Sequence, residues 1–296
     1  MRQVSRRSMV GGMTALALGA ATRANAAPRP GGPEKAARTV RHVVEKTWHT
    51  RQPTVMFPDL PQEFWDAHPE FWDPAEGRLV TRSLTWVLRR NNRVVLVDTG
   101  IGNDKERPGS PDFHQQKSRY LELLGIRPEK VDLVINTHLH TDHVGWNTRL
   151  DRGRWVPTFP NATYLFPEAD YEHFRDDPAV EDSVTPVIAA GQAVLWRGKR
   201  HRVDRDLVLE SAPGHTPGAS VLKLRDRAVF LGDLLHNPAQ LLEPATNSFF
   251  CLDPAQARAS RARVLDWAAD TGAAVHPTHF PGGRITRTGH GFRLLD

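Results

Sequence analysis

The segment that most constrains the fold is a cluster of histidines and aspartates directly after a short apolar run. Residues 131–135 (VDLVI) predict a buried strand, and the next ten residues read NTHLHTDHVG. In an extended chain, residues two apart point to the same side, so the imidazoles of His138 and His140 can bind one ion. If a helix begins next, Asp142 and His143 project from its first turn beside them. Three imidazoles and one carboxylate within six residues suit a borderline divalent metal such as Zn²⁺.

Other predicted strand ends carry side chains of the same kind. His215 lies in the motif PGHTPG, Asp233 follows the apolar run AVFLG, and His279 ends the segment PTH. Each comes where an apolar run ends, which is where active-site loops gather. A lone histidine is usually structural, but this joint order and spacing is hard to obtain by chance. The sequence therefore predicts a metal site with more ligands than one ion needs.

Strand and helix patterns alternate along the chain. Strands are predicted at 84–88, 94–97, 131–135, 163–166, 207–209, 220–224, 228–231, 274–275 and 292–294, and helices at 115–124 and 254–270. Asn91-Asn92 between the first two strands is typical of a hairpin turn. Asp253-Pro254 and Gly272 are typical of the start and end of a helix. Sheets interleaved with helices indicate an α/β or α+β fold.

The N-terminal residues resemble an export signal. Residues 1–26 contain the pair Arg6-Arg7, a short apolar run and the sequence ANA, which is the pattern of a cleavable secretory signal of the twin-arginine type. The apolar run is shorter than the ~20 residues that span a bilayer. We expect cleavage after Ala26, a Pro/Gly-rich linker at 27–38 and one domain at 39–296. The mature protein would then be periplasmic or secreted, without membrane association.

Composition excludes two classes of protein. The single cysteine, Cys251, rules out an intramolecular disulfide scaffold and a cysteine-rich zinc site. The formal net charge of +5 falls to +1 once the four arginines of the leader are removed. No basic stripe remains to indicate nucleic-acid binding.

From about residue 40 onward, the chain resembles the metallo-β-lactamase-fold hydrolases. The residues that carry the resemblance are H-x-H-x-D-H, PGHTPG, the Gly-Asp pair and the late histidine, in that order. The resemblance implies a four-layer αββα sandwich with a dinuclear site at one edge of the paired sheets. The implied ligands are His138, His140 and His215 for one ion, Asp142, His143 and His279 for the other, and Asp233 between them.

The motif VDTG also fits this family. By resemblance its Asp98 orients a ligand histidine from outside the ligand set, although a turn-forming aspartate at a strand end is the simpler alternative. Two divalent cations that share a water lower its pKa, so that hydroxide is available at neutral pH to attack a lactone, ester or phosphotriester. Asp142 could also accept a proton. Zn²⁺ is the preferred metal, with Mn, Fe or Co as alternatives, because imidazole and carboxylate accept all of them.

The pattern is most similar to the branch of methyl parathion hydrolase and the acyl-homoserine lactonases. Two other branches of the family fit less well. Only 17 residues follow His279, too few for the helical C-terminal domain of the related thioesterases. The zinc β-lactamases generally lack a bridging aspartate, which this chain supplies as Asp233. The lactonases commonly carry a tyrosine three residues beyond the bridging aspartate, where this chain has His236. His236 could donate a proton or hydrogen bond there, or be structural. A β-lactam or thioester substrate, or a periplasmic metal-binding protein without turnover, stays open.

The aromatic segment 57–72 (FPDLPQEFWDAHPEFW) is a candidate substrate pocket. Phe64, Trp65, Phe71 and Trp72 could form a lid or wall for an apolar ester or lactone. They could equally be core, or the contact of a homodimer. Trp146, just past the histidine motif, is a further candidate for the pocket wall.

Overall fold

Two sheets stacked face to face form the centre of the protein in the computed structural model, which describes residues 39–295. The predicted leader (1–26) and linker (27–38) lie outside the described residues. The strands of the six-stranded sheet are, in spatial order, β1 (Thr39–His49), β2 (Val80–Arg90), β3 (Arg93–Val97), β4 (Leu133–Ile135), β7 (Thr163–Pro167) and β8 (Ala193–Trp196). Those of the seven-stranded sheet are β15 (Phe292–Leu294), β14 (Gly283–Arg287), β13 (Ala274–Pro277), β12 (Ala228–Gly232), β11 (Ser220–Leu224), β10 (Leu207–Ser211) and β9 (Arg200–Arg202).

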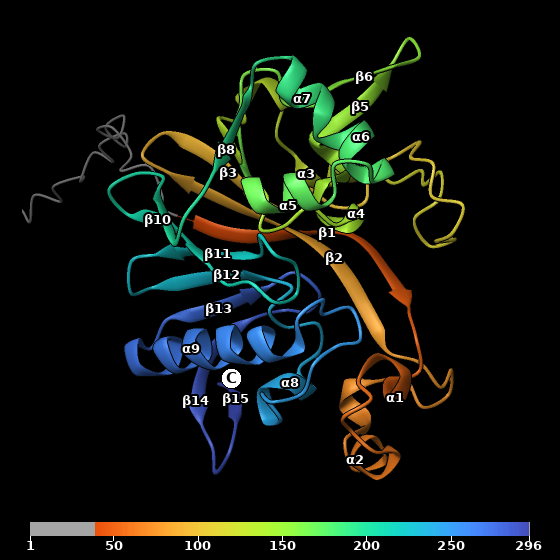
Figure 1. Ribbon diagram of the computed structural model, residues 1–296, viewed down its shortest axis with the longest axis vertical. Coiled ribbons are helices and arrows are strands. Elements are labelled where there is room, and N and C mark those ends of the chain that lie inside the picture. Colours follow the sequence, from red (N-terminus) through yellow and green to blue (C-terminus); the bar gives the residue numbers. More distant parts are fainter. Residues whose placement is uncertain (1–38, 296) are drawn as a thin grey trace, which may run out of the picture. The chain divides into compact units, whose positions relative to one another are not determined.

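Helices cover the outer faces of both sheets (Figure 1). The helices of the described residues are α1 (Pro53–Met56), α2 (Gln62–Ala67), α3 (Tyr120–Leu124), α4 (Thr141–Val144), α5 (Glu168–His173), α6 (Pro178–Ser183), α7 (Thr185–Ala189), α8 (Ala239–Leu242) and α9 (Pro254–Thr271), and of these α1 and α2 lie at one end of the protein rather than on a sheet face. A separate hairpin, β5 (Thr148–Asp151) and β6 (Arg154–Pro157), lies beside α7. The order helix, sheet, sheet, helix is the predicted αββα sandwich. No helix among residues 39–295 has the length and apolar character that a membrane span needs.

The layers follow from the alternation of apolar side chains along each strand. In β2, Leu84 and Trp86 pack between the sheets, while Val87 faces the helices of the first outer layer. In β12, Phe230 faces the first sheet and Leu231 packs against α9. Successive residues of a strand point to opposite faces, so both sheets bury both of their faces. Each fully buried side chain of this size stabilises the fold by about 1.5–3 kcal/mol.

Local sequence signals are confirmed at two element boundaries. Asn91 and Asn92 have φ values of 47° and 61° in the β2–β3 turn, as the tight hairpin requires. At the start of α9, the side chain of Asp253 accepts a hydrogen bond from Gln256 N, and the helix ends at Gly272 with φ 67°.

The predicted helix at 115–124 is wrong over its first half. Only Tyr120–Leu124 is helical, and Gly125 ends it as expected. Gln115 has φ 45°, and its backbone N–H donates to Lys105 O. Ser118 N–H donates to the Asn103 side chain. These contacts hold residues 115–119 in the loop before α3.

Candidate metal centre

The ends of parallel strands bring the predicted ligands to one edge of the sandwich. β3 and β4 are parallel, as are β12 and β13, so their carboxyl ends lie together at that edge. The chain leaving β4 carries His138 and His140 and enters α4, where Asp142 and His143 lie in the first turn. Asp233 directly follows β12.

The two remaining histidines reach the same edge from neighbouring loops. His279 follows β13, and His215 lies in the loop between β10 and β11. All seven predicted ligands therefore converge, and ring nitrogens or carboxylate oxygens within each of two groups lie within 4.8 Å of one another. Their binding of a metal stays a prediction.

The first group consists of His138, His140, His215 and Asp233. Oδ2 of Asp233 lies 3.6 Å from His138 Nε2 and 3.3 Å from His215 Nε2. His215 Nε2 also lies 3.0 Å from His140 Nδ1. Three ring nitrogens and one carboxylate oxygen are thus close enough to share one ion.

The second group consists of Asp142, His143 and His279. The Nε2 atoms of His143 and His279 each lie 3.8 Å from an oxygen of Asp142. They lie 3.1 and 3.0 Å from Asp233 Oδ1. Asp233 therefore presents Oδ2 to the first group and Oδ1 to the second, which is the arrangement of a bridging carboxylate.

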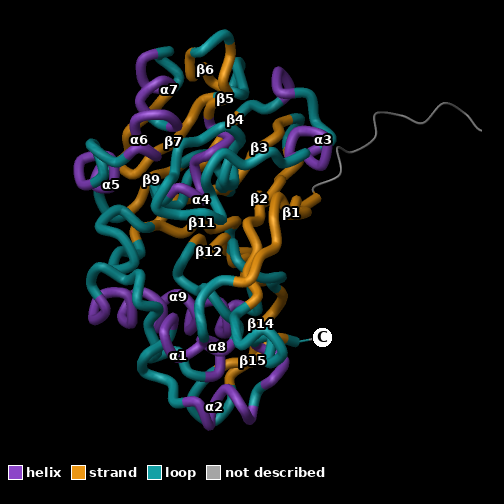
Figure 2. The backbone as a smooth tube through the Cα atoms, turned by 90° about the vertical axis from the view of Figure 1, so that its right-hand side faces the viewer, coloured by secondary structure: helices purple, strands orange, loops and turns teal. Residues whose placement is uncertain are grey.

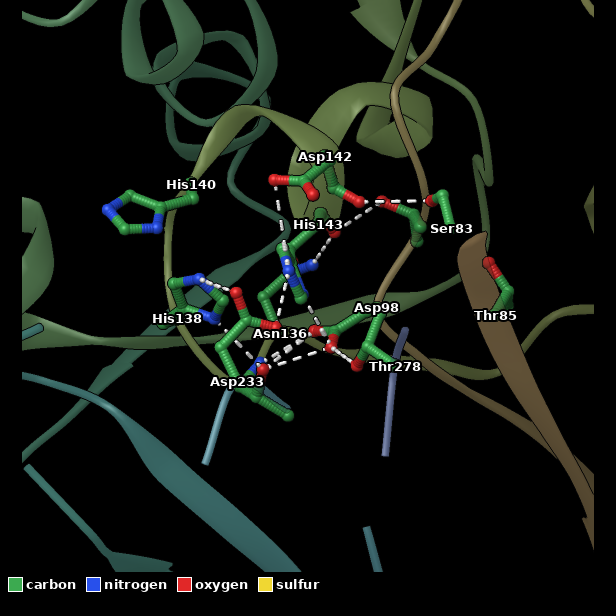
Figure 3. Close-up of polar contacts among 12 residues, drawn as sticks. Ser83, Thr85, Asp98, Asn136, His138, His140, Asp142, His143, Asp233 and Thr278 are labelled. Atoms are coloured by element: carbon green, nitrogen blue, oxygen red, sulfur yellow. Dashed lines mark hydrogen bonds and ion pairs between the residues drawn. The ribbon is translucent and has the colours of Figure 1, made fainter. Parts of the chain in front are cut away.

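Hydrogen bonds from outside the two groups orient His143 and His279, and Figure 3 shows the contact between His143 and Asp98. His143 Nδ1 lies 2.8 Å from Asp98 Oδ2, and His279 Nδ1 lies 2.7 Å from the carbonyl oxygen of Arg82. In each ring the Nε2 atom is thereby turned toward the centre. Asp98 also accepts from Thr137 N and from the hydroxyl of Thr278, so it connects three of the site's loops.

Several buried polar atoms in the centre lie close to one another but make no hydrogen bond. Among the described residues, these include Nε2 of His138, Nε2 of His143 and Oδ1 of Asp233. Buried polar groups are almost always hydrogen-bonded, so such a convergence needs an explanation. A divalent cation would satisfy these atoms, and the set of imidazoles and carboxylates fits two such ions.

Electrostatics in the centre also favour cation binding. Burial lowers the pKa of His138 well below its usual value, that of His140 to about 3 and that of His215 to about 4, so these rings are neutral and able to coordinate. For Asp233, burial would raise the pKa, but the surrounding histidines, His143 first, outweigh it and hold the pKa well below normal. For His143, burial would lower the pKa, but the carboxylates of Asp233 and Asp98 raise it well above normal. The same carboxylates would attract a metal ion.

Asp170, which no sequence motif singles out, connects the two loops that carry the histidines of the first group. Its fully buried carboxylate accepts hydrogen bonds from Leu139 N (3.1 Å), Gly218 N (2.5 Å) and Thr216 Oγ1 (2.9 Å). Leu139 lies between His138 and His140, and Thr216 is next to His215. No motif marks Asp170, because an aspartate in the middle of α5 looks like an ordinary surface residue of a helix.

Glu45 is a second buried carboxylate with a positioning role. It accepts from Ile101 N at 2.6 Å and from the indole N–H of Trp146 at 2.6 Å. It thereby holds the loop that follows Asp98 against the residues that follow α4. Burial raises the pKa of Glu45.

The cavity over the centre corrects the prediction for the substrate pocket. It has a volume of about 470 Å³, and its lining includes Asp142 and His236, whose catalytic roles stay predictions. Its aromatic lining, within the described part of the chain, consists of Trp48, Phe113, Phe174 and Phe250. The residues predicted for the pocket wall were Phe64, Trp65, Phe71, Trp72 and Trp146, and none of them is part of the lining of this cavity.

The predicted pocket residues are packed elsewhere. Trp65 is fully buried in a separate apolar cluster with Phe57 and Ala239, and Phe64, Phe71 and Trp72 pack against that cluster. Figure 2 shows α1, α2 and α8 gathered at the end of the protein where this cluster lies. Trp146 is stacked on Tyr120 in the core.

An αββα sandwich with histidines and aspartates gathered at its strand ends defines a class of metalloproteins. Within that class, this chain belongs to the metallo-β-lactamase superfamily, whose sequence profile matches residues 78–279. A probable metallo-hydrolase of Methanocaldococcus jannaschii is 29% identical over 130 residues, which are 43% of this chain and 50% of that relative. The match thus spans half the length of the curated relative.

Solved structures show the same fold at low sequence identity. The hydrolase AbOPH of the β-lactamase superfamily superposes with a TM-score of 0.70 and 20% identity, over 87% of this chain and 94% of the other. AidC, a dizinc quorum-quenching lactonase in complex with a homoserine product, gives a TM-score of 0.69 and 17% identity over 86% and 93%.

Proposed function

We propose that the protein is a dinuclear metal-dependent hydrolase that opens lactones or cleaves related esters or phosphotriesters. The observation that carries the proposal is Asp233, which presents one carboxylate oxygen to each of two ligand groups beneath a cavity of about 470 Å³. Such a bridge suits two cations rather than one. Zn²⁺ is our first choice of metal, and export to the periplasm or the medium is part of the proposal.

The chain's own residues have distinct roles in this proposal. The two ligand groups would hold the divalent cations, which would supply Lewis acidity toward the scissile carbonyl or phosphoryl group and would lower the pKa of a nearby water. Asp142 lines the cavity and is placed to accept a proton from the attacking water. His236 also lines the cavity, and in this proposal it donates a hydrogen bond or a proton to the leaving oxygen.

Lactones are the preferred substrate class because AidC, a structure of similar fold, is a lactonase. The first experiment follows acid release from a medium-chain acyl-homoserine lactone by pH-stat, using residues 27–296 loaded with Zn²⁺. We expect turnover that chelation abolishes and Zn²⁺ restores. A phosphotriester, an aryl ester and a β-lactam are assayed in parallel. Protein that holds two metal ions but turns over none of these would instead support a metal-binding role without catalysis.

Replacing His236 by Phe is expected to lower kcat about 100-fold, the usual effect of losing one acid or base group. The His236 side chain is 4% exposed, with Nε2 3.3 Å from Asp233 Oδ2 and 3.5 Å from Ser248 Oγ. His236 also lies within ligand distance of Asp233 and His279, so bound metal must be counted in the variant. Unchanged kcat would remove His236 from the mechanism, and loss of one ion would make it a ligand instead.

A further inference from the structure

Two arginines with no acidic partner lie on one wall of the cavity. Arg51 follows β1 and Arg78 precedes β2, and both line the cavity. Leu79 N donates to Arg51 O and Thr50 N to Leu79 O, so the two arginines come from adjacent, hydrogen-bonded stretches of chain. Within residues 39–295, neither guanidinium makes a hydrogen bond or an ion pair with a protein group.

The acidic residues of the cavity lining already have partners. Asp142 and Asp233 belong to the two ligand groups. The carboxylate of Asp177 caps α6 by accepting from Ala179 N at 2.7 Å. Asp112 lies 3.8 Å from the ammonium of Lys46. Among the described residues, Arg51 and Arg78 are therefore the charged side chains of this lining that have neither a hydrogen-bond nor an ion-pair partner.

The guanidinium of Arg51 lies against a row of aromatic rings that begins at His236, beside the metal centre. The ring of His236 is stacked on Phe250 at 6.3 Å, and Phe250 contacts Phe249 at 4.1 Å between ring centroids. The guanidinium of Arg51 lies 4.7 Å above the ring of Phe249 and 6.0 Å from that of Phe250. Both phenylalanines are unusually exposed, at 44% and 40%.

Such a wall is complementary to a ligand that is apolar near the metal centre and anionic further out. The phenyl rings hold the guanidinium of Arg51 in place by cation–π contact and leave its N–H groups free to bind an anion. A carboxylate bound by two guanidinium groups gains charge-assisted hydrogen bonds, which are stronger than neutral ones.

We propose that the substrate carries a carboxylate at the end of its apolar chain, and that Arg51 and Arg78 bind this group. The inference rests on the hydrolase activity proposed above, and it names the class of ester or lactone that the site selects. The arginines determine specificity and have no part in bond cleavage.

The test compares two esters of equal chain length, para-nitrophenyl valerate and mono-para-nitrophenyl glutarate, which differ by a terminal carboxylate. The metal-loaded protein is expected to hydrolyse the glutarate ester with a kcat/KM about tenfold higher, a preference that weakens as salt is added. In R51A/R78A the ratio of the two values should fall to about one. The control R149A/R154A removes the same charge from exposed arginines of the β5–β6 hairpin and should keep the ratio.

A second measurement separates failure of this inference from failure of the hydrolase proposal. Binding of the corresponding anilides, which are resistant to cleavage, is followed by calorimetry with the same proteins. Tighter binding of the anionic anilide that R51A/R78A loses would support the carboxylate site even if neither ester is cleaved. Equal binding of the two anilides, equal hydrolysis of the two esters, or a preference that persists in R51A/R78A would overturn it.

Discussion

Replacing Asp233 by Asn is expected to abolish most turnover and to reduce the bound metal from two ions to one or none. The substitution keeps the size of the side chain but removes the charge that faces both ligand groups, with Oδ1 and Oδ2 each within 3.3 Å of a histidine Nε2. Losing the transition-state stabilisation of one ion costs about 4 kcal/mol, which is about a 1000-fold drop in kcat/KM.

Metal content by mass spectrometry and kcat/KM for the best substrate are measured on the same samples. Asp206→Asn is the matched control, because Asp206 is also buried and charged but pairs with Arg90 and Arg225 outside the cavity. This control is expected to lower the thermal stability and to retain both ions. If Asp233→Asn also retained two ions and normal kcat/KM, Asp233 would not be a bridging ligand.

The predicted ligand set converges in the structure because its geometry is largely local. The His138–His143 cluster needs only a strand that turns into a helix, and β4 followed by α4 provides it. The more distant residues His215, Asp233 and His279 follow strands, and strand ends meet at one edge of a sheet sandwich. The positions of these residues along the chain are therefore enough to predict that they meet at one site.

The substrate cavity could not be predicted in the same way, because its walls are set by contacts between distant segments. The aromatic segment 57–72 looked like a pocket, but Phe57 and Trp65 pack against Ala239 of α8, far along the chain. The wall instead includes Arg51 and Phe250, and the guanidinium of Arg51 also lies over the ring of the neighbouring Phe249. β1 was also missed, although it pairs with β2 from Thr39 to His49, because the polar residues on its exposed face mask the strand pattern.

Replacing Asp170 by Asn is expected to lower the affinity for one of the two proposed metal ions 10- to 100-fold and to leave the affinity for the other unchanged. The amide offers one acceptor in place of two, so its NH₂ group must face a donor, either Leu139 N or Gly218 N. The loops that carry His138, His140 and His215 then lose their common anchor, and loss of such an outer partner typically costs that much metal affinity. Titration against a chelating indicator resolves the two affinities. Asp132→Asn, which also removes a carboxylate bound to a backbone N–H, at Val94, is the control.

The pH dependence of stability separates this anchoring role from simple loss of packing. Burial raises the pKa of Asp170 from 3.8 to about 6, outweighing its three hydrogen bonds. A carboxyl group with a raised pKa in the folded state stabilises the fold fully below pH 3.8, and this contribution is lost as the pH rises through 6. In chelated protein, the stability of wild type relative to Asp170→Asn should therefore fall by about 2 kcal/mol between pH 4 and pH 7. A difference that does not change with pH, together with equal weakening of both ions, would mean that Asp170 only fills space and does not position the loops.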